Sequence, residues 1–121
     1  MPYIGCQLNR KIGQEQSERL EKRFGKTISL FPGIGEDVLM TAVTGDAQMA
    51  FQGKCNIPAA FLDVRIWSKA LGDDPDYGIV SQSLIRDVFE VTGVPKENIY
   101  ITFESYDHWG RKNGSRYMLV Q

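Results

Sequence analysis

The chain has 121 residues, with 14 basic and 15 acidic side chains and a formal net charge of -1. This length favours a single domain over residues 1–121, and the balanced charge argues against nucleic acid or an anionic membrane as a partner. No apolar run approaches the roughly 20 residues that cross a bilayer, and the first residues lack the cationic start and apolar stretch of a signal peptide. We therefore expect a cytoplasmic protein, and secretion without a signal peptide stays open as an alternative.

A strand, a helix and a second strand are predicted for the first half of the chain. Residues 2–8 (PYIGCQL) predict a strand, which a proline can open because it donates no ladder hydrogen bond there. Helical spacing from Gln14 to about Phe31 places four apolar residues on one face, namely Leu20, Phe24, Ile28 and Phe31. Pro32-Gly33 ends this helix, residues 38–44 (VLMTAVT) predict the second strand, and residues 49–58 are expected to be irregular.

The second half is predicted to repeat this order. Residues 59–67 (AAFLDVRIW) predict a strand, and the acidic segment at residues 73–76 (DDPD) supplies the first-turn groups of a helix. That helix carries an apolar stripe and ends at Gly93; the stripe is Val80, Leu84, Val88 and Val91. A fourth strand follows at residues 98–104, and the polar tail is predicted to end in a short strand at residues 116–120. Each strand–helix–strand unit predicts a right-handed crossover between parallel strands.

The predicted strands have one apolar face and one mixed face. The apolar face joins Ile4, Cys6 and Leu8 to alternate residues of the third and fourth strands. Two helices can cover only one face of the sheet, and a sheet with parallel strands rarely leaves the other face to water. We therefore expect other subunits to cover the mixed face.

Metal and thiol chemistry find little support in the sequence. Cys6 and Cys55 are the only cysteines, His108 is the only histidine, and no CxxC motif or metal-ligand spacing is present. We expect two free thiols, no metal site, and a surface or loop-capping role for His108.

Four segments, in order along nearly the whole chain, resemble the macrophage migration inhibitory factor family of the tautomerase superfamily. The chain starts with Met-Pro and runs directly into a strand, and residues 49–51 (MAF) follow the second strand. Residues 94–101 (VPKENIYI) resemble the family's turn from helix to strand. Residues 109–110 (WG) and 113–115 (NGS) resemble its carboxy-terminal stretch.

This resemblance implies an α+β fold in which duplicated β-α-β units form a four-stranded mixed sheet with two helices on one face. It also implies a homotrimer with pockets between neighbouring subunits. The implied activity is keto–enol tautomerisation of small α-keto acids such as phenylpyruvate, without a cofactor.

The reactive group that the resemblance implies is the nitrogen of Pro2. Removal of Met1 turns this nitrogen from a non-basic amide into a secondary amine. An α-amino group titrates near pH ~8, and burial among apolar groups lowers its pKa toward the range useful for proton transfer. The alternative is that Pro2 only begins a strand and protects the terminus.

Further pocket residues follow from the same resemblance. Tyr100 matches a tyrosine that closes the pocket from the adjacent subunit, with a half-buried strand tyrosine as the alternative. Thr102 falls where well-known members have asparagine, and Tyr117 falls where they have phenylalanine. Ile66 and Trp67 fall where a backbone N–H binds substrate, although Trp67 can equally be a core anchor.

One departure concerns the charge that binds a substrate carboxylate. The family's pocket lysine has no clear counterpart, because Ile34 falls near its place and Lys26 lies too early. Arg111 is our candidate replacement, since a planar guanidinium grips a carboxylate through two hydrogen bonds. Lys112 and Arg65 are alternatives, and a solvated loop at residues 111–112 is the competing interpretation.

Other functions stay open at this stage. Relatives that perform hydration, dehalogenation or decarboxylation need extra arginines and an acidic partner beside the proline, for which Arg65, Arg111 and Glu104 are candidates. A cytokine-like protein that binds a receptor would need no catalysis, and the missing lysine favours it. A vestigial trimer without chemistry is the third possibility.

Overall fold

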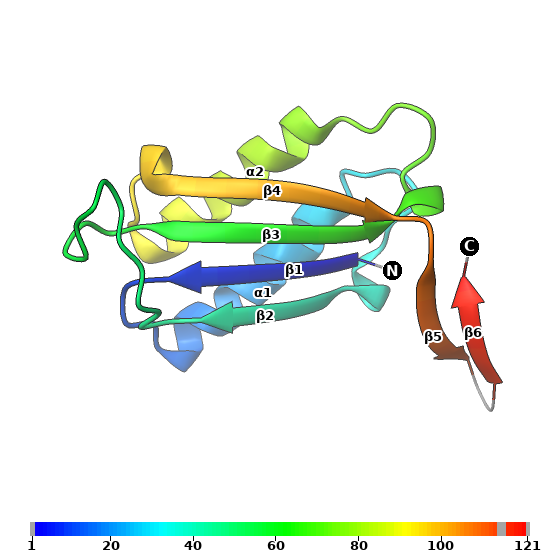
Figure 1. Ribbon diagram of the computed structural model, residues 1–121, viewed down its shortest axis with the longest axis horizontal. Coiled ribbons are helices and arrows are strands. Elements are labelled where there is room, and N and C mark those ends of the chain that lie inside the picture. Colours follow the sequence, from blue (N-terminus) through cyan, green and yellow to red (C-terminus); the bar gives the residue numbers. More distant parts are fainter. Residues whose placement is uncertain (1, 114–115, 121) are drawn as a thin grey trace.

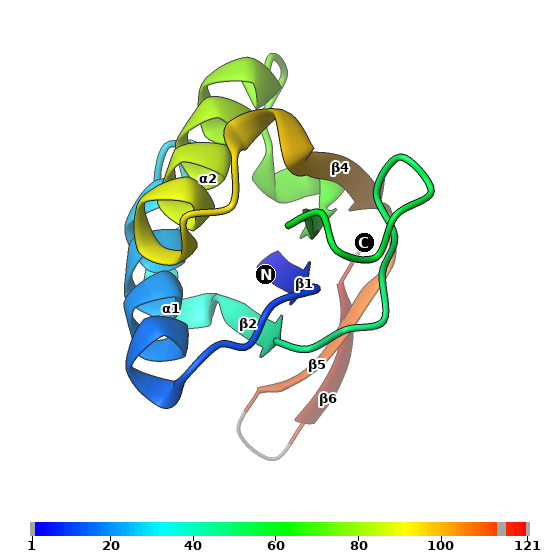
Figure 2. The ribbon, with the colours of Figure 1, turned by 90° about the vertical axis from the view of Figure 1, so that its left-hand side faces the viewer.

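The computed structural model describes residues 2–113 and 116–120, with side chains described up to residue 112. Its main layer is a four-stranded sheet in the order β2-β1-β3-β4, and two helices cover one face (Figures 1 and 2). The strands are β1 (Pro2–Leu8), β2 (Met40–Thr44), β3 (Ala60–Trp67) and β4 (Ile99–Tyr106). The helices are α1 (Gln14–Ile28) and α2 (Tyr77–Thr92).

Strand pairing confirms the predicted pair of β-α-β units. β1 runs parallel to β2 and β3 runs parallel to β4, while β1 and β3 pair antiparallel in the centre of the sheet. The result is the predicted four-stranded mixed sheet with two helices on one face. Neither helix in the described part of the chain is long and apolar enough to cross a membrane.

The core lies between the helices and the apolar face of the sheet. Leu20, Phe24 and Ile28 of α1 are fully buried, and the predicted stripe of α2 is buried as well. From the sheet, the buried alternate residues include Ile4, Leu62 and Val64. The apolar periodicity therefore identified the faces of both helices and of the central strands correctly.

Both ends of α2 follow the predicted signals. The carboxylate of Asp76 accepts a hydrogen bond from the backbone N–H of Ile79 at 3.0 Å, which satisfies one of the free donors at the helix start. Gly93 adopts a left-handed conformation with φ of 79°, which glycine reaches without a steric penalty.

Several features differ from the sequence prediction, including the end of β4, which reaches Tyr106 and not residue 104. The first helix ends at Ile28, and Phe31 lies in the following turn, where its buried ring contacts Tyr77 and Phe103. The second strand begins at Met40, because residues 36–38 form the short 3₁₀ helix η1 (Glu36–Val38). The polar tail was expected to hold one short strand, yet it forms an antiparallel hairpin of β5 (Trp109–Asn113) and β6 (Arg116–Val120).

Gly25, near the C-terminal end of α1, allows η1 to pack against the helix. A β-carbon at position 25 would lie 2.5 Å from a carboxylate oxygen of Glu36. A larger residue at this position would push Glu36 and the rest of η1 away. The turn before β2 is therefore held close to α1.

Candidate active site

A cavity of about 310 Å³ lies where β1 begins. Figure 1 shows that β1 begins at the end of the sheet next to the β5–β6 hairpin. Its wall combines the start of β1, η1, the first residue of β2 and β5. The lining residues are Pro2, Tyr3, Asp37, Val38, Met40, Trp109, Gly110 and Arg111. A cavity of this size falls at the lower end of the range for small-molecule sites.

Pro2 is buried at the first position of β1. It lies opposite Ile66 of β3 in the antiparallel register, and the neighbouring Tyr3 pairs with Met40 of β2. Pairing on both sides fixes the backbone, and proline suits the strand start because it donates no ladder hydrogen bond. The sheet thus holds the Pro2 ring at the cavity wall and limits its contact with water.

Ile66 and Trp67 lie at the end of β3, beside Pro2. The side chain of Ile66 is buried in the core, so only its backbone can face a ligand. Trp67 is half-buried, and its indole N–H is enclosed without a hydrogen-bond partner among the described residues. Strand pairing brings both residues beside Pro2, but neither lines its cavity, and their substrate contacts stay a prediction.

Arg111 is exposed and lines the cavity together with Pro2. It belongs to a strand, whereas the competing interpretation placed it in a solvated loop. This position is compatible with the predicted hydrogen bonds from Arg111 to a substrate carboxylate. Anion binding itself stays a prediction.

Of the eight cavity residues, the sequence analysis predicted only Pro2 and Arg111 as site residues, and Asp37 is the charged residue that it missed. It lies in η1, and the parallel pairing of β1 with β2 brings η1 next to the start of β1. Glu104, the predicted acidic partner, accepts a hydrogen bond from the Tyr106 hydroxyl on the open sheet face and is absent from the cavity wall. That bond is the main cause that raises the pKa of Tyr106. A short acidic turn directly before a predicted parallel strand was the available signal for Asp37.

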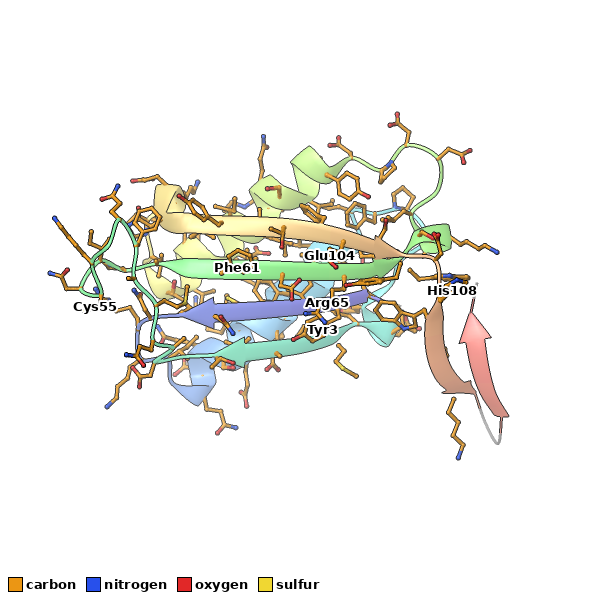
Figure 3. The ribbon with its side chains drawn as sticks, viewed as in Figure 1. Tyr3, Cys55, Phe61, Arg65, Glu104 and His108 are labelled. Atoms are coloured by element: carbon orange, nitrogen blue, oxygen red, sulfur yellow. The ribbon has the colours of Figure 1, made fainter. Side chains whose placement is uncertain are left out.

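Arg65 projects from β3 on the open face of the sheet, close to Tyr3 (Figure 3). Its guanidinium lies 5.4 Å from the ring centroid of Tyr3 and donates two hydrogen bonds to Asp63, at 2.9 and 3.2 Å. The hydrogen bonds to Asp63 are the main cause that raises the pKa of Arg65. Its charge is therefore already partly neutralised, which favours Arg111 as the anion-binding group.

A second cavity of about 430 Å³ adjoins the first on the open sheet face. The two cavities share Tyr3, Met40, Trp109 and Gly110, and the second adds Arg65, Tyr106 and His108. His108 is exposed, in line with the predicted surface position. Trp109 and Gly110 lie between the two spaces.

Tyr100 and Thr102 do not reach Pro2 within one chain. Tyr100 lies opposite Phe61 near the start of β3, whereas Pro2 lies opposite Ile66 near its end. About 17 Å of strand separates them at roughly 3.3 Å per residue. Tyr100 is 59% exposed and packs edge-on against Phe51, with 5.6 Å between ring centroids. Tyr117 lies in β6, and its side chain falls outside the described part of the structure.

The structure also places the residues near the missing pocket lysine and the two cysteines. Ile34 is buried in the core, and Lys26 lies in the last turn of α1. Both cysteines are free, and burial raises the pKa of the Cys6 thiol to about 12, so Cys6 is not a reactive thiolate. Among the described residues, no group of three or more His, Cys, Asp or Glu side chains could hold a metal ion.

Comparison with known proteins gives a match in structure only. No family model and no curated protein sequence matches the chain. The solved structure of MIF2 from Leishmania major is 22% identical, covers 92% of this chain and 93% of its own, and has a TM-score of 0.75. The macrophage migration inhibitory factor homologue from Prochlorococcus marinus is 25% identical over 84% of this chain and 86% of its own, with a TM-score of 0.72. Pt0534, solved after inactivation by 2-oxo-3-pentynoate, is 14% identical over 86% of this chain and 85% of its own, also with a TM-score of 0.72.

Proposed function

The chain has the fold of the macrophage migration inhibitory factor family, and on this premise we propose that it is a cofactor-independent keto–enol tautomerase of small α-keto acids of the phenylpyruvate type. Pro2 is the proposed general base after removal of Met1. The observation that carries the proposal is the buried Pro2 at the wall of a cavity that also contains Arg111.

The proposed reaction moves one proton between carbon and oxygen. In the direction of the enol, the Pro2 nitrogen takes a proton from the carbon next to the ketone, a carbon–carbon double bond forms, and the carbonyl oxygen gains a proton. Burial and the nearby Arg111 cation both disfavour the protonated amine, so both lower the pKa of the free Pro2 nitrogen. A fall of about two units from ~8 makes the neutral amine dominant at pH 7.

The cavity wall fits an aryl α-keto acid. Arg111 supplies a cation for the carboxylate, and Val38, Met40 and Trp109 supply apolar surface for the ring. Pro2 belongs to the same wall, which supports the proposal that it acts on the carbon between ring and ketone. This arrangement supports a substrate with one carboxylate and one apolar end.

The proposed active assembly is a homotrimer, and the predicted site is incomplete without a second copy. Tyr100 and Thr102 lie away from the Pro2 cavity in their own chain, and the sheet face that carries them and Arg65 has no helix covering it (Figures 2 and 3). Light scattering at micromolar concentration is expected to give a mass of about three chains. A monomeric mass would contradict both the assembly and the shared pocket.

The direct test combines intact mass with an ultraviolet assay of phenylpyruvate enol decay. Intact mass shows whether Met1 has been removed, and the assay measures tautomerisation. Treatment with 2-oxo-3-pentynoate adds a test of the amine itself, because a neutral amine reacts covalently with an alkyne that is conjugated to a ketone. We expect one inhibitor mass on the amino-terminal peptide and loss of activity.

Two outcomes would favour other functions. A Met1-free protein that neither accelerates enol decay nor reacts with the inhibitor would exclude Pro2 catalysis and leave a cytokine-like or vestigial protein. A protein that reacts with the inhibitor but not with phenylpyruvate would indicate a different acid as substrate. The acidic residue in the cavity, Asp37, then favours a hydratase, dehalogenase or decarboxylase of a related acid.

Arg111→Ala is expected to raise KM for phenylpyruvate by about 10- to 100-fold, since a hydrogen bond to a charged group contributes about 1.5–3 kcal/mol. An uncharged ketone of similar shape should be turned over with little change, because it lacks the carboxylate. Lys112→Ala is the matched control, since the next residue of a strand points to the opposite face and Lys112 is absent from the cavity wall. Equal effects of Arg111→Ala on both substrates would contradict carboxylate binding.

A further inference from the structure

We infer that Asp37 is a second catalytic acid–base group of the Pro2 cavity and exchanges a proton with the substrate oxygen while Pro2 exchanges one with carbon. This inference rests on the proposed tautomerase function and extends it. It follows from the composition of the cavity wall, where Asp37 is the only carboxylate among the described lining residues.

The position of Asp37 is fixed by its surroundings. Glu36, directly before it, packs against α1 at Gly25, and the backbone N–H of Leu39 donates a hydrogen bond to the Glu36 carbonyl at 3.1 Å. β2 begins at Met40, which pairs with Tyr3 beside Pro2. Contacts on both sides therefore hold the short turn that presents Asp37 at the start of β1.

The carboxylate of Asp37 is available to a ligand. It is exposed, and no described residue forms a hydrogen bond or ion pair with it. Other carboxylates of the same region are already engaged: Asp63 binds Arg65, and Glu104 binds Tyr106. The oxygens of Asp37 are therefore open to a ligand and can accept a hydrogen bond or a proton from an enol hydroxyl.

Asp37 and Pro2 can catalyse the reaction with a single proton shared between them. In the direction of the ketone, the enol O–H bond breaks and its proton passes to the Asp37 carboxylate. The electron pair re-forms the carbonyl, and the protonated Pro2 amine delivers its proton to carbon, forming the new C–H bond. Pro2 is then neutral and Asp37 protonated, and transfer of this proton from Asp37 to Pro2 restores the starting state. The reverse reaction uses the same groups in the opposite protonation states.

Asp37 also acts on the charge of the Pro2 amine. A carboxylate in the same cavity favours the ammonium form and raises the amine pKa, whereas burial of Pro2 and the Arg111 cation lower it. The other titratable groups facing this end of β1 are Tyr3 in the same cavity and Arg65, Tyr106 and His108 in the adjoining one. Removal of the Asp37 charge alone should therefore lower the amine pKa.

The test is the Asp37→Asn variant, which keeps the shape and removes the charge, with Glu36→Gln as the matched neighbour outside the cavity. We expect opposite changes in two rates. Turnover of phenylpyruvate enol should fall by about 10- to 100-fold, the lower part of the range for a positioned acid–base group. Labelling of Pro2 by 2-oxo-3-pentynoate at neutral pH should become several-fold faster, since a larger fraction of the amine is neutral. Glu36→Gln should change neither rate appreciably.

Each alternative result has a separate meaning. Normal turnover in Asp37→Asn would overturn the catalytic role, and slower turnover together with slower labelling would overturn it in favour of a structural role. Failure of the wild-type protein to tautomerise any keto acid would instead reject the proposed function. The labelling rate in that case still reports whether Asp37 tunes the Pro2 amine.

Discussion

Replacement of Pro2 by glycine is expected to lower kcat/KM for phenylpyruvate enol by about 10²- to 10³-fold, the contribution typical of a positioned acid–base group. Glycine leaves a primary amine in place of the secondary one, and it removes the ring that keeps water from the nitrogen. Its free backbone also loosens the strand start that Ile66 and Met40 now hold from both sides. Enol decay is measured for both proteins after intact mass has shown that Met1 is absent from each.

Low activity of Pro2→Gly could come from loss of the fold or from loss of the catalytic base, and two measurements distinguish these causes. Residues 3–8 of β1 keep their pairing in the variant, so its thermal unfolding should stay cooperative and its mass in solution unchanged. Covalent labelling by 2-oxo-3-pentynoate should slow in parallel with turnover. Activity equal to that of the wild-type protein would remove Pro2 from the mechanism.

The topology could be predicted because local patterns determine each part of it. Apolar residues at steps of three and four defined the buried sides of α1 and α2, and alternation defined the core face of the strands. The crossover rule then made each strand–helix–strand unit parallel. Pairing of the two halves through β1 and β3 is non-local, and only the family resemblance implied a single mixed sheet.

The β5 strand could not be predicted from its own residues. It reads WGRKN, without the alternation or the β-branched residues that mark a strand, and among the described residues it pairs only with β6. Its conformation therefore depends on the hairpin as a whole. Recognition of this strand matters for function, because it brings Trp109 and Arg111 to the Pro2 cavity.

Asp37 shows why part of the site escaped the sequence analysis. It lies far from Pro2 in the chain, and the parallel register of β1 and β2 brings the two together only after α1 has crossed between them. The family resemblance did not point to Asp37, because in this segment it concerned only the family's pocket lysine, whose place falls near Ile34. Glu104 was the candidate for the acidic partner, but β4 carries it to the open face of the sheet.

The second large effect is expected in the packing of the two helices, where Asp87→Ala should lower the free energy of unfolding by about 2–4 kcal/mol. The side chain of Asp87 is 4% exposed and joins α2 to α1. Its carboxylate accepts a hydrogen bond from the Thr27 hydroxyl at 2.6 Å and one from the Arg23 guanidinium at 3.1 Å. Alanine would leave the buried Thr27 hydroxyl unpaired and open a small cavity.

Urea unfolding at one fixed protein concentration measures this loss, since a trimer would make the midpoint depend on concentration. Glu90→Ala is the matched control. Glu90 binds the same arginine from the exposed surface of α2, so its loss should destabilise the protein much less than the loss of Asp87. Comparable losses in the two variants would show that burial of Asp87 does not decide the effect.

The pH dependence of Asp87→Asn tests the cause. Burial raises the pKa of Asp87, an effect that the hydrogen bond from Thr27 and the charge of Arg23 oppose without offsetting it. The folded protein therefore holds this proton more tightly than the unfolded chain, so its stability relative to the asparagine variant is greatest below about pH 4. It should fall as pH rises from there through the raised pKa and then level off. A relative stability that rises over the same interval would mean that the ion pair with Arg23 outweighs the desolvation of the carboxylate.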